Sequence, residues 1–138
     1  MQIAYYLLTN NLLLMKYKLI EKANPQNREQ KKFYASAVNI GKKDIKAISK
    51  EIAGRSSLTR GDIENVLINF IDELPTYLKD GFSVKLGDFG TMRLSLSSEG
   101  AELAKDFKST SIKPKVVFTP GKEVKDAISK IEYVRITE

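Results

Sequence analysis

The chain has 138 residues, a length that suits one domain, and it contains neither cysteine nor histidine. Disulfides and thiolate metal sites are therefore excluded and the usual general base is missing. We accordingly expect no metal site, no cofactor, no small-molecule substrate, no catalytic residues and no enzymatic activity. The net charge of +6 and the 42% of hydrophobic residues predict a globular protein with a polyanionic partner, such as nucleic acid or an acidic membrane surface.

The charges are segregated along the chain. Residues 16–55 hold 11 basic and 4 acidic side chains, a net charge of +7. Residues 59–106 hold 5 basic and 9 acidic side chains, a net charge of −4, whereas residues 108–135 hold 7 and 3, a net charge of +4. Lysines that only keep a small protein soluble would explain the total but not this pattern. The two basic flanks therefore support a polyanionic partner.

Residues 1–14 differ from the rest of the chain. They are largely apolar, but Thr9, Asn10 and Asn11 interrupt the apolar run, and the whole stretch is shorter than the ~20 residues of a membrane-spanning helix. The segment also lacks the basic region and the cleavage site of a signal peptide. We expect it to be a dispensable appendage or the product of a translation start placed too early, with Met15 as the alternative start.

Two short strands are expected in residues 15–43. Apolar and polar side chains alternate over residues 17–22, and the polar cluster at residues 24–27 predicts a turn. A second strand is expected at residues 33–40, where a glycine follows.

Two helices are expected next. Asp44 predicts the start of the first helix, which runs to about residue 53, and Thr59 and Asp62 have the spacing of a capping box at the start of the second. Apolar residues then recur at helical spacing from Ile63 to Leu78. A helix hairpin alone cannot cover so long an apolar stripe, so a partner subunit is expected to cover the remainder. We assign to a dimer interface Ile63, Val66, Leu67, Phe70, Ile71 and Leu74.

The hydrophobic period changes to two after residue 81, as is typical of strands. Met92, Leu94 and Leu96 are expected to share one face of a strand. Thr119 and Pro120 have the pattern of an N-cap and the first residue of a terminal helix. The expected strands are residues 84–86, 89–97, 112–118 and 133–136, and residues 98–109 show no clear period.

Several strings in this region, taken in order, resemble the HU/IHF family of bacterial histone-like proteins. They are Val84-Lys85-Leu86, Phe89-Gly90-Thr91, and Phe118-Thr119-Pro120-Gly121-Lys122 followed by Lys125-Asp126-Ala127. The resemblance covers residues 44 to about 130. Residues 15–43 look like the N-terminal extension of a longer subgroup found in Bacteroides-type bacteria. We therefore expect three parts: the appendage 1–14, the strand extension 15–43 and an HU-like domain at 44–138.

The resemblance implies an α+β fold with a helix hairpin, an antiparallel sheet that carries a protruding β-arm, and a C-terminal helix, with extra N-terminal strands. It implies an intertwined homodimer whose sheets form a saddle and whose two arms reach around double-stranded DNA. In that family a glycine permits tight curvature of the sheet, and Gly90 takes its place here. The implied protein is cytoplasmic, belongs to the nucleoid, binds duplex phosphates with little sequence preference, and bends or condenses DNA without a membrane partner.

Lys122 is the residue we expect first to bind a phosphate. It follows Pro120 and Gly121 at the expected start of a helix, where backbone N–H groups and a lysine together can hold an anion. The full set of expected DNA-binding residues is Lys85, Arg93, Lys105, Lys108, Lys113, Lys115, Lys122 and Lys125.

The arm departs from the family pattern. Ser95 and Ser97 stand where the family carries arginines, and the tip has no wedge proline. The tip contains three acids, Glu99, Glu102 and Asp106, which repel phosphate. A second function therefore stays open, namely a structural or protein-interaction module on an HU scaffold with weak or lost DNA binding, in which the N-terminal strands pair with a sheet edge.

Overall fold

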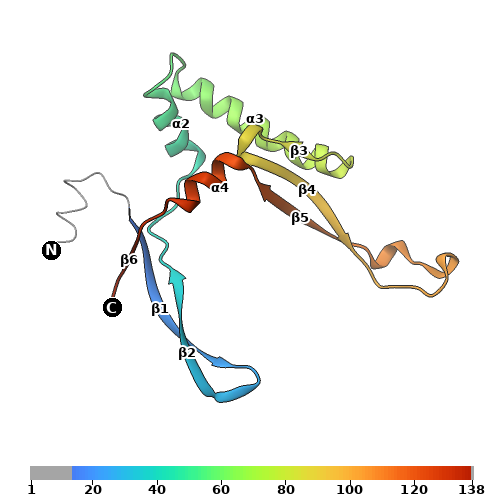
Figure 1. The fold of residues 1–138 in the computed structure, drawn as a ribbon. Coiled ribbons are helices and arrows are strands. Elements are labelled where there is room, and N and C mark those ends of the chain that lie inside the picture. Colours follow the sequence, from blue (N-terminus) through green and yellow to red (C-terminus); the bar gives the residue numbers. More distant parts are fainter. Residues whose placement is uncertain (1–13, 138) are drawn as a thin grey trace. The chain divides into compact units, whose positions relative to one another are not determined.

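The structure is a computed structural model that describes residues 14–137. The expected appendage, apart from its last residue, lies outside the described residues. The chain divides into two compact units (Figure 1). One unit combines residues 14–42 with residues 127–137, and the other comprises residues 43–126.

The first unit is built on a β-hairpin. Strands β1 (Met15–Asn24) and β2 (Asn27–Ala37) pair in antiparallel orientation around the turn expected at residues 24–27. The short strand β6 (Tyr133–Arg135) pairs in parallel with the start of β1, which gives the sheet order β2-β1-β6. Within residues 14–137, β6 therefore completes a sheet whose other two strands lie more than 90 residues earlier in the chain.

The bounds expected for the strand at residues 33–40 are wrong. β2 begins at Asn27, six residues before the expected start, and ends at Ala37, so that Ile40 lies outside the sheet with 81% of its surface exposed. The physical reason is pairing. The residues of β2 up to Lys32 are polar and have no apolar face to bury. Their backbone groups nevertheless form hydrogen bonds with β1, and this pairing extends as far as Ala23 and Lys31.

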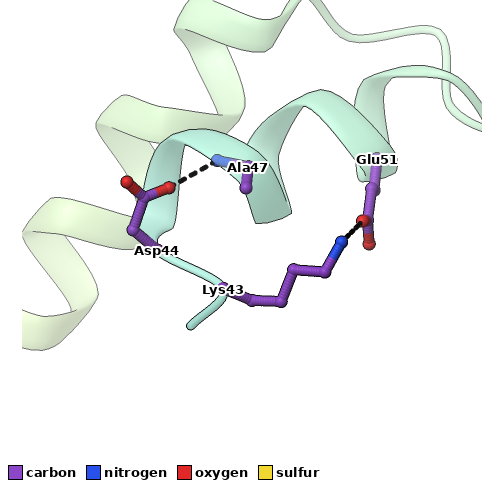
Figure 2. Close-up of polar contacts among 4 residues, drawn as sticks. All are labelled: Lys43, Asp44, Ala47 and Glu51. Carbon is purple, nitrogen blue, oxygen red and sulfur yellow. Dashed lines mark hydrogen bonds and ion pairs between the residues drawn. The ribbon is translucent and has the colours of Figure 1, made fainter. Parts of the chain in front are cut away.

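The second unit begins with helix α2 (Ile45–Ala53), whose start is fixed by two polar contacts shown in Figure 2. The Asp44 carboxylate accepts a hydrogen bond from the Ala47 N–H at 2.8 Å, which confirms the expected cap. Lys43 Nζ lies 2.6 Å from Glu51 Oε1. This hydrogen bond raises the pKa of Lys43 and lowers the pKa of Glu51.

Helix α3 (Arg60–Lys79) follows and packs against α2. The expected capping box is present, because Thr59 Oγ1 accepts from the Asp62 N–H at 3.2 Å and the Asp62 carboxylate accepts from the Thr59 N–H at 3.4 Å. Among the apolar side chains of residues 14–137, only Ile63 and Leu78 of this helix are buried, at 5% and 8% exposure. The single chain therefore buries a very small core.

A three-stranded antiparallel sheet completes the second unit. Its strands are β3 (Val84–Lys85), β4 (Gly90–Ser97) and β5 (Lys113–Pro120), in the order β3-β4-β5. A 3-10 turn, η1 (Gly87–Phe89), joins β3 to β4, and the long connection from β4 to β5 holds two more, η2 (Ala104–Asp106) and η3 (Ser109–Ser111). β4 and β5 form the arm, and the connection is its tip (Figure 1).

The start expected for the last helix is wrong. Thr119 pairs with Thr91 and Pro120 with Gly90, so both residues belong to β5, and helix α4 (Lys122–Ser129) begins only after Gly121. The β4–β5 ladder carries the strand two residues further than the local pattern suggests. With its helices and antiparallel strands, the structure confirms the α+β class.

Candidate functional site

The β3-β4-β5 sheet has two chemically different faces, which its register defines. Residues that pair across neighbouring strands point to the same face, and residues next to each other in one strand point to opposite faces. Arg93 pairs with Val117, and the pairing continues without a shift to Ser97 and Lys113. Each side chain of the sheet can therefore be assigned to one face.

One face carries four of the expected DNA-binding residues and no acid. On β5, Lys113 and Lys115 lie opposite Ser97 and Ser95, and on β3, Lys85 lies opposite Thr91. We call this the basic sheet face and define it by the exposed cations Lys85, Arg93, Lys113 and Lys115. The side chains between these cations are mainly serine and threonine, which can donate hydrogen bonds to phosphate oxygens.

The opposite face is apolar, and much of it is uncovered in the single chain. The expected grouping of Met92, Leu94 and Leu96 is confirmed, and Val116 and Phe118 of β5 lie opposite Leu94 and Met92. Leu96 is 63% exposed and Val116 is 55% exposed. The sheet thus presents cations on one side and, on the other, an apolar surface that needs a further covering element.

Two glycines fix the junction between the sheet and α4. Gly90 has φ +153°, and a Cβ atom there would lie 2.5 Å from the Thr119 carbonyl oxygen and 2.6 Å from the Phe118 ring. A Cβ on Gly121 would collide with the Asp88 carbonyl, and the Gly121 N–H donates to the Phe89 carbonyl at 2.8 Å. The strands and the start of α4 therefore approach more closely than any other residue type permits.

Lys122 and Lys125 are both exposed on α4, three residues apart and thus on one side of the helix. The Gly121 N–H is already used by Phe89, so the donors left at this end are those of the first helical turn itself. Glu123 lies in that turn as well. Phosphate binding by Lys122 therefore rests on its charge and on these remaining donors, and it stays a prediction.

The two expected residues of the arm tip have different surroundings. Lys108 lines an open hollow at the root of the tip together with Lys113 of the basic sheet face. Lys105 lies in η2 beside Asp106 and is not part of this hollow. The other residues of the hollow are Ser97, Ser98, Glu99, Thr110 and Ser111. The hollow extends the basic sheet face by one lysine and a group of hydroxyls, with one acid among them.

The residues assigned to a dimer interface divide into inner and outer positions on α3. Ile63 is buried within its own chain, and Leu67 and Leu74 are half-buried. Val66, Phe70 and Ile71 stay exposed, at 63%, 40% and 45%. The outer positions are therefore the ones with apolar surface left for a partner.

Sequence reasoning assigned no DNA contact to the β1–β2 hairpin, but the register places lysines together there too. Lys18 and Lys22 of β1 share one face with Lys32 of β2, and the alternation of β1 puts Lys16 on that face. The sequence signal was the alternation of lysine with apolar residues in β1. It was interpreted only as a strand.

Neither a metal-binding cluster nor a membrane-spanning helix lies within residues 14–137. No group of three or more histidine, cysteine, aspartate or glutamate side chains lies there in an arrangement that could hold a metal ion. No helix in the same residues is long and apolar enough to cross a membrane.

Comparison with known proteins agrees with the family resemblance of the sequence. No curated protein sequence matches the chain significantly. Sixteen chains of solved structures do match. One is the crystal structure of a protein from Bacteroides vulgatus ATCC 8482 that is named as a candidate bacterial DNA-binding protein, with a TM-score of 0.65 and 13% identity. The match covers 91% of the present chain but only 49% of that protein, so the chain spans about half its length.

The family comparison covers nearly the whole described chain. The HU-HIG family model, which describes an HU domain fused to a winged helix-turn-helix, Ig or glycine-rich motif, matches residues 14–135. The resemblance of the 84–91 and 118–127 strings to HU proteins is thereby confirmed, and the match also includes the N-terminal hairpin. The chain belongs to the HU-HIG family of HU-domain proteins.

Proposed function

We propose that the chain is a sequence-tolerant architectural protein that binds the phosphates of double-stranded DNA and bends or compacts the duplex. It acts as a homodimer in the bacterial nucleoid and has no enzymatic activity. Membership of the HU-HIG family and the fold shared with the Bacteroides vulgatus protein support this proposal.

The observation that carries the proposal is the basic sheet face. Lys85, Arg93, Lys113 and Lys115 lie on one side of one sheet without an acid among them, while the apolar residues of the same strands lie on the other side. Charges arranged only to keep the protein soluble would be distributed over both faces and mixed with acids. Four cations on one face suit a row of phosphates, and none of them is aimed by a rigid pocket at a particular base.

The homodimer is supported by the small amount of apolar surface that the chain buries by itself. A core of two buried apolar side chains within residues 14–137 is too small to offset the conformational entropy lost on folding. The outer positions of α3 and the apolar face of the β3-β4-β5 sheet both leave apolar surface uncovered in the second unit. A second copy of the chain offers the same two surfaces in return, as symmetric dimers require.

The arm tip favours the second candidate function, a protein-interaction module on an HU scaffold. The tip residues Glu99, Glu102 and Asp106 are all exposed, and they would face the duplex if the arm wrapped around it. In the DNA-binding proposal, the tip therefore contributes little, and the basic sheet face together with Lys122 and Lys125 of α4 supplies the contacts.

Titration of a labelled duplex by fluorescence anisotropy over a range of salt concentrations distinguishes the two functions. If the basic sheet face alone binds phosphates, four cations per protomer give a log–log salt slope of about −7 for a dimer. The double substitution Lys113→Gln and Lys115→Gln should flatten this slope by about 3 to 4.

The matched control removes two lysines from another exposed surface of the same unit. Lys46→Gln and Lys50→Gln change α2, which packs against α3, and should leave affinity and slope nearly unchanged. If the wild-type chain binds duplex no better than an unrelated protein of the same net charge, the DNA-binding proposal is wrong and the interaction module is favoured. Equal losses in both double variants would show that only total charge matters.

A further inference from the structure

The β1–β2 hairpin also gathers lysines on one face, around the paired residues Ile20 and Tyr34. Its register pairs Lys22 with Lys32, and by alternation Lys16 and Lys18 point to the same side. We call this the basic hairpin face and define it by Lys16, Lys18, Lys22 and Lys32. The two acids of the hairpin are not part of it, because Glu21 points to the other side and Glu29 lies beyond the register shift near the turn.

The other face of the hairpin carries Glu21 and, next to the neighbouring strand β6, a group of apolar residues. Tyr17 packs edge-on against Tyr133, with ring centroids 6.5 Å apart, and both rings line a hollow with Met15, Ala35 and Ala37. Side chains alternate between the two faces along each strand, and the register places these five residues on the side opposite the four lysines. The contact of Tyr17 with Tyr133 therefore lies on the side of the sheet away from the four lysines.

Two of these lysines face each other directly across the hairpin. Lys22 and Lys32 lie directly opposite each other in the ladder, an arrangement that is destabilising for like charges. The Lys22 ammonium lies over the Tyr34 ring, 5.8 Å from its centroid, which shows that this aromatic side chain shares the face. A polyanion that binds at this pair of lysines removes that cost.

We infer that the basic hairpin face is a second DNA-binding surface of this protein, which contacts the phosphate backbone of duplex DNA. The inference rests on the proposed function, because it takes the ligand to be the same. Lys16, Lys18 and Lys22 follow one strand, so Lys16 and Lys22 are about 20 Å apart at ~3.4 Å per residue. That span corresponds to about six base pairs of duplex. Such a row of ammonium groups matches a run of phosphates and reads no base sequence.

The test compares hairpin and sheet variants of the full chain in the same duplex titration. Lys16→Gln, Lys22→Gln and Lys32→Gln together should reduce affinity at least about tenfold and flatten the log–log salt slope by about 5 for a dimer. A triple control, Lys46→Gln, Lys50→Gln and Lys79→Gln, removes the same charge from the exposed surface of α2 and α3. It should retain near wild-type affinity. Far-ultraviolet circular dichroism establishes that each variant is folded.

Two further measurements test whether charge alone is needed and whether DNA is the ligand of this face. A triple Lys→Arg variant at the same hairpin positions should bind like the wild type, because charge alone is needed, and loss of binding in that variant would overturn the inference. Anionic phosphatidylserine vesicles and a duplex RNA of matched length are titrated in parallel. If the Gln variant loses affinity only for vesicles or only for RNA, the face serves that ligand instead of DNA.

The same experiment separates this inference from the proposed function. If the wild-type chain binds the duplex and Lys113→Gln with Lys115→Gln weakens it while the hairpin variant does not, the hairpin inference is wrong and the proposed function stands. If the wild-type chain does not bind the duplex, the proposed function itself fails.

Discussion

The exposed apolar positions of α3 lead to a quantitative prediction about dimerisation. Phe70 is 40% exposed, which leaves about 80 Å² of a residue whose full area is on the order of 200 Å². At 25 cal/mol per Å², covering this surface stabilises the dimer by about 2 kcal/mol per protomer, or about 4 kcal/mol for both copies. Phe70→Ala should therefore raise the dimer dissociation constant by up to about a thousandfold.

Phe70→Asp should have a larger effect, because it also places an unpaired charge in the interface. Since the single chain buries so few apolar side chains, we expect this variant to lose its fold together with its partner. Sedimentation velocity gives the association state and circular dichroism the fold. Phe33→Ala in the β1–β2 hairpin, where the ring is 67% exposed, is the control for loss of an exposed phenylalanine. A native-sequence chain that is a folded monomer at micromolar concentration would refute the reasoning.

Three other predictions concern the sites described above. The double substitution Lys122→Glu and Lys125→Glu should weaken duplex binding at least about tenfold. Trimming residues 99–106 to a short turn should leave binding equal or stronger. The opposite ranking in a titration would mean that the tip binds DNA. Gly90→Ala should destabilise the fold by about 3 kcal/mol in urea denaturation, because the backbone there is strained for alanine and the added Cβ is crowded. Gly100→Ala is the control and should be nearly neutral, because no atom lies within 4 Å of a Cβ at that position. Equal effects of the two substitutions would contradict this reasoning. Glu51→Gln should lower the melting temperature slightly at neutral pH. Because Lys43 lowers the pKa of Glu51, this difference should vanish as the pH falls through that pKa, and a difference that persists in acid would have another cause.

The features that sequence reasoning located well depend on neighbours in the chain. The capping box of Thr59 and Asp62, the cap at Asp44 and the shared face of Met92 and Leu94 each follow from residues a few positions apart. Helical and strand periods are local properties, so the sequence pattern carries them directly.

The features that sequence reasoning missed depend on pairing between segments that are distant in the chain. Nothing in the polar start of β2 at Asn27 resembles a strand until β1 is placed beside it. Thr119 and Pro120 form a good local helix start, but the β4 ladder extends β5 through both. The apolar period of α3 located the stripe correctly, yet it could not distinguish Ile63, which faces its own chain, from Val66, which is left exposed. The same limit concealed the basic hairpin face, because Lys22 and Lys32 are brought together only by register.

The salt dependence of the wild-type chain connects the two basic faces to the acidic tip. With four cations per protomer, the basic sheet face alone gives a slope of about −7 for a dimer, and adding the four lysines of the basic hairpin face makes it as steep as about −14. Each acid of the tip that approaches the duplex would make the slope shallower. A slope well beyond −7 would therefore require contacts outside the β3-β4-β5 sheet, and the lysines that share one face of the hairpin are placed to supply them.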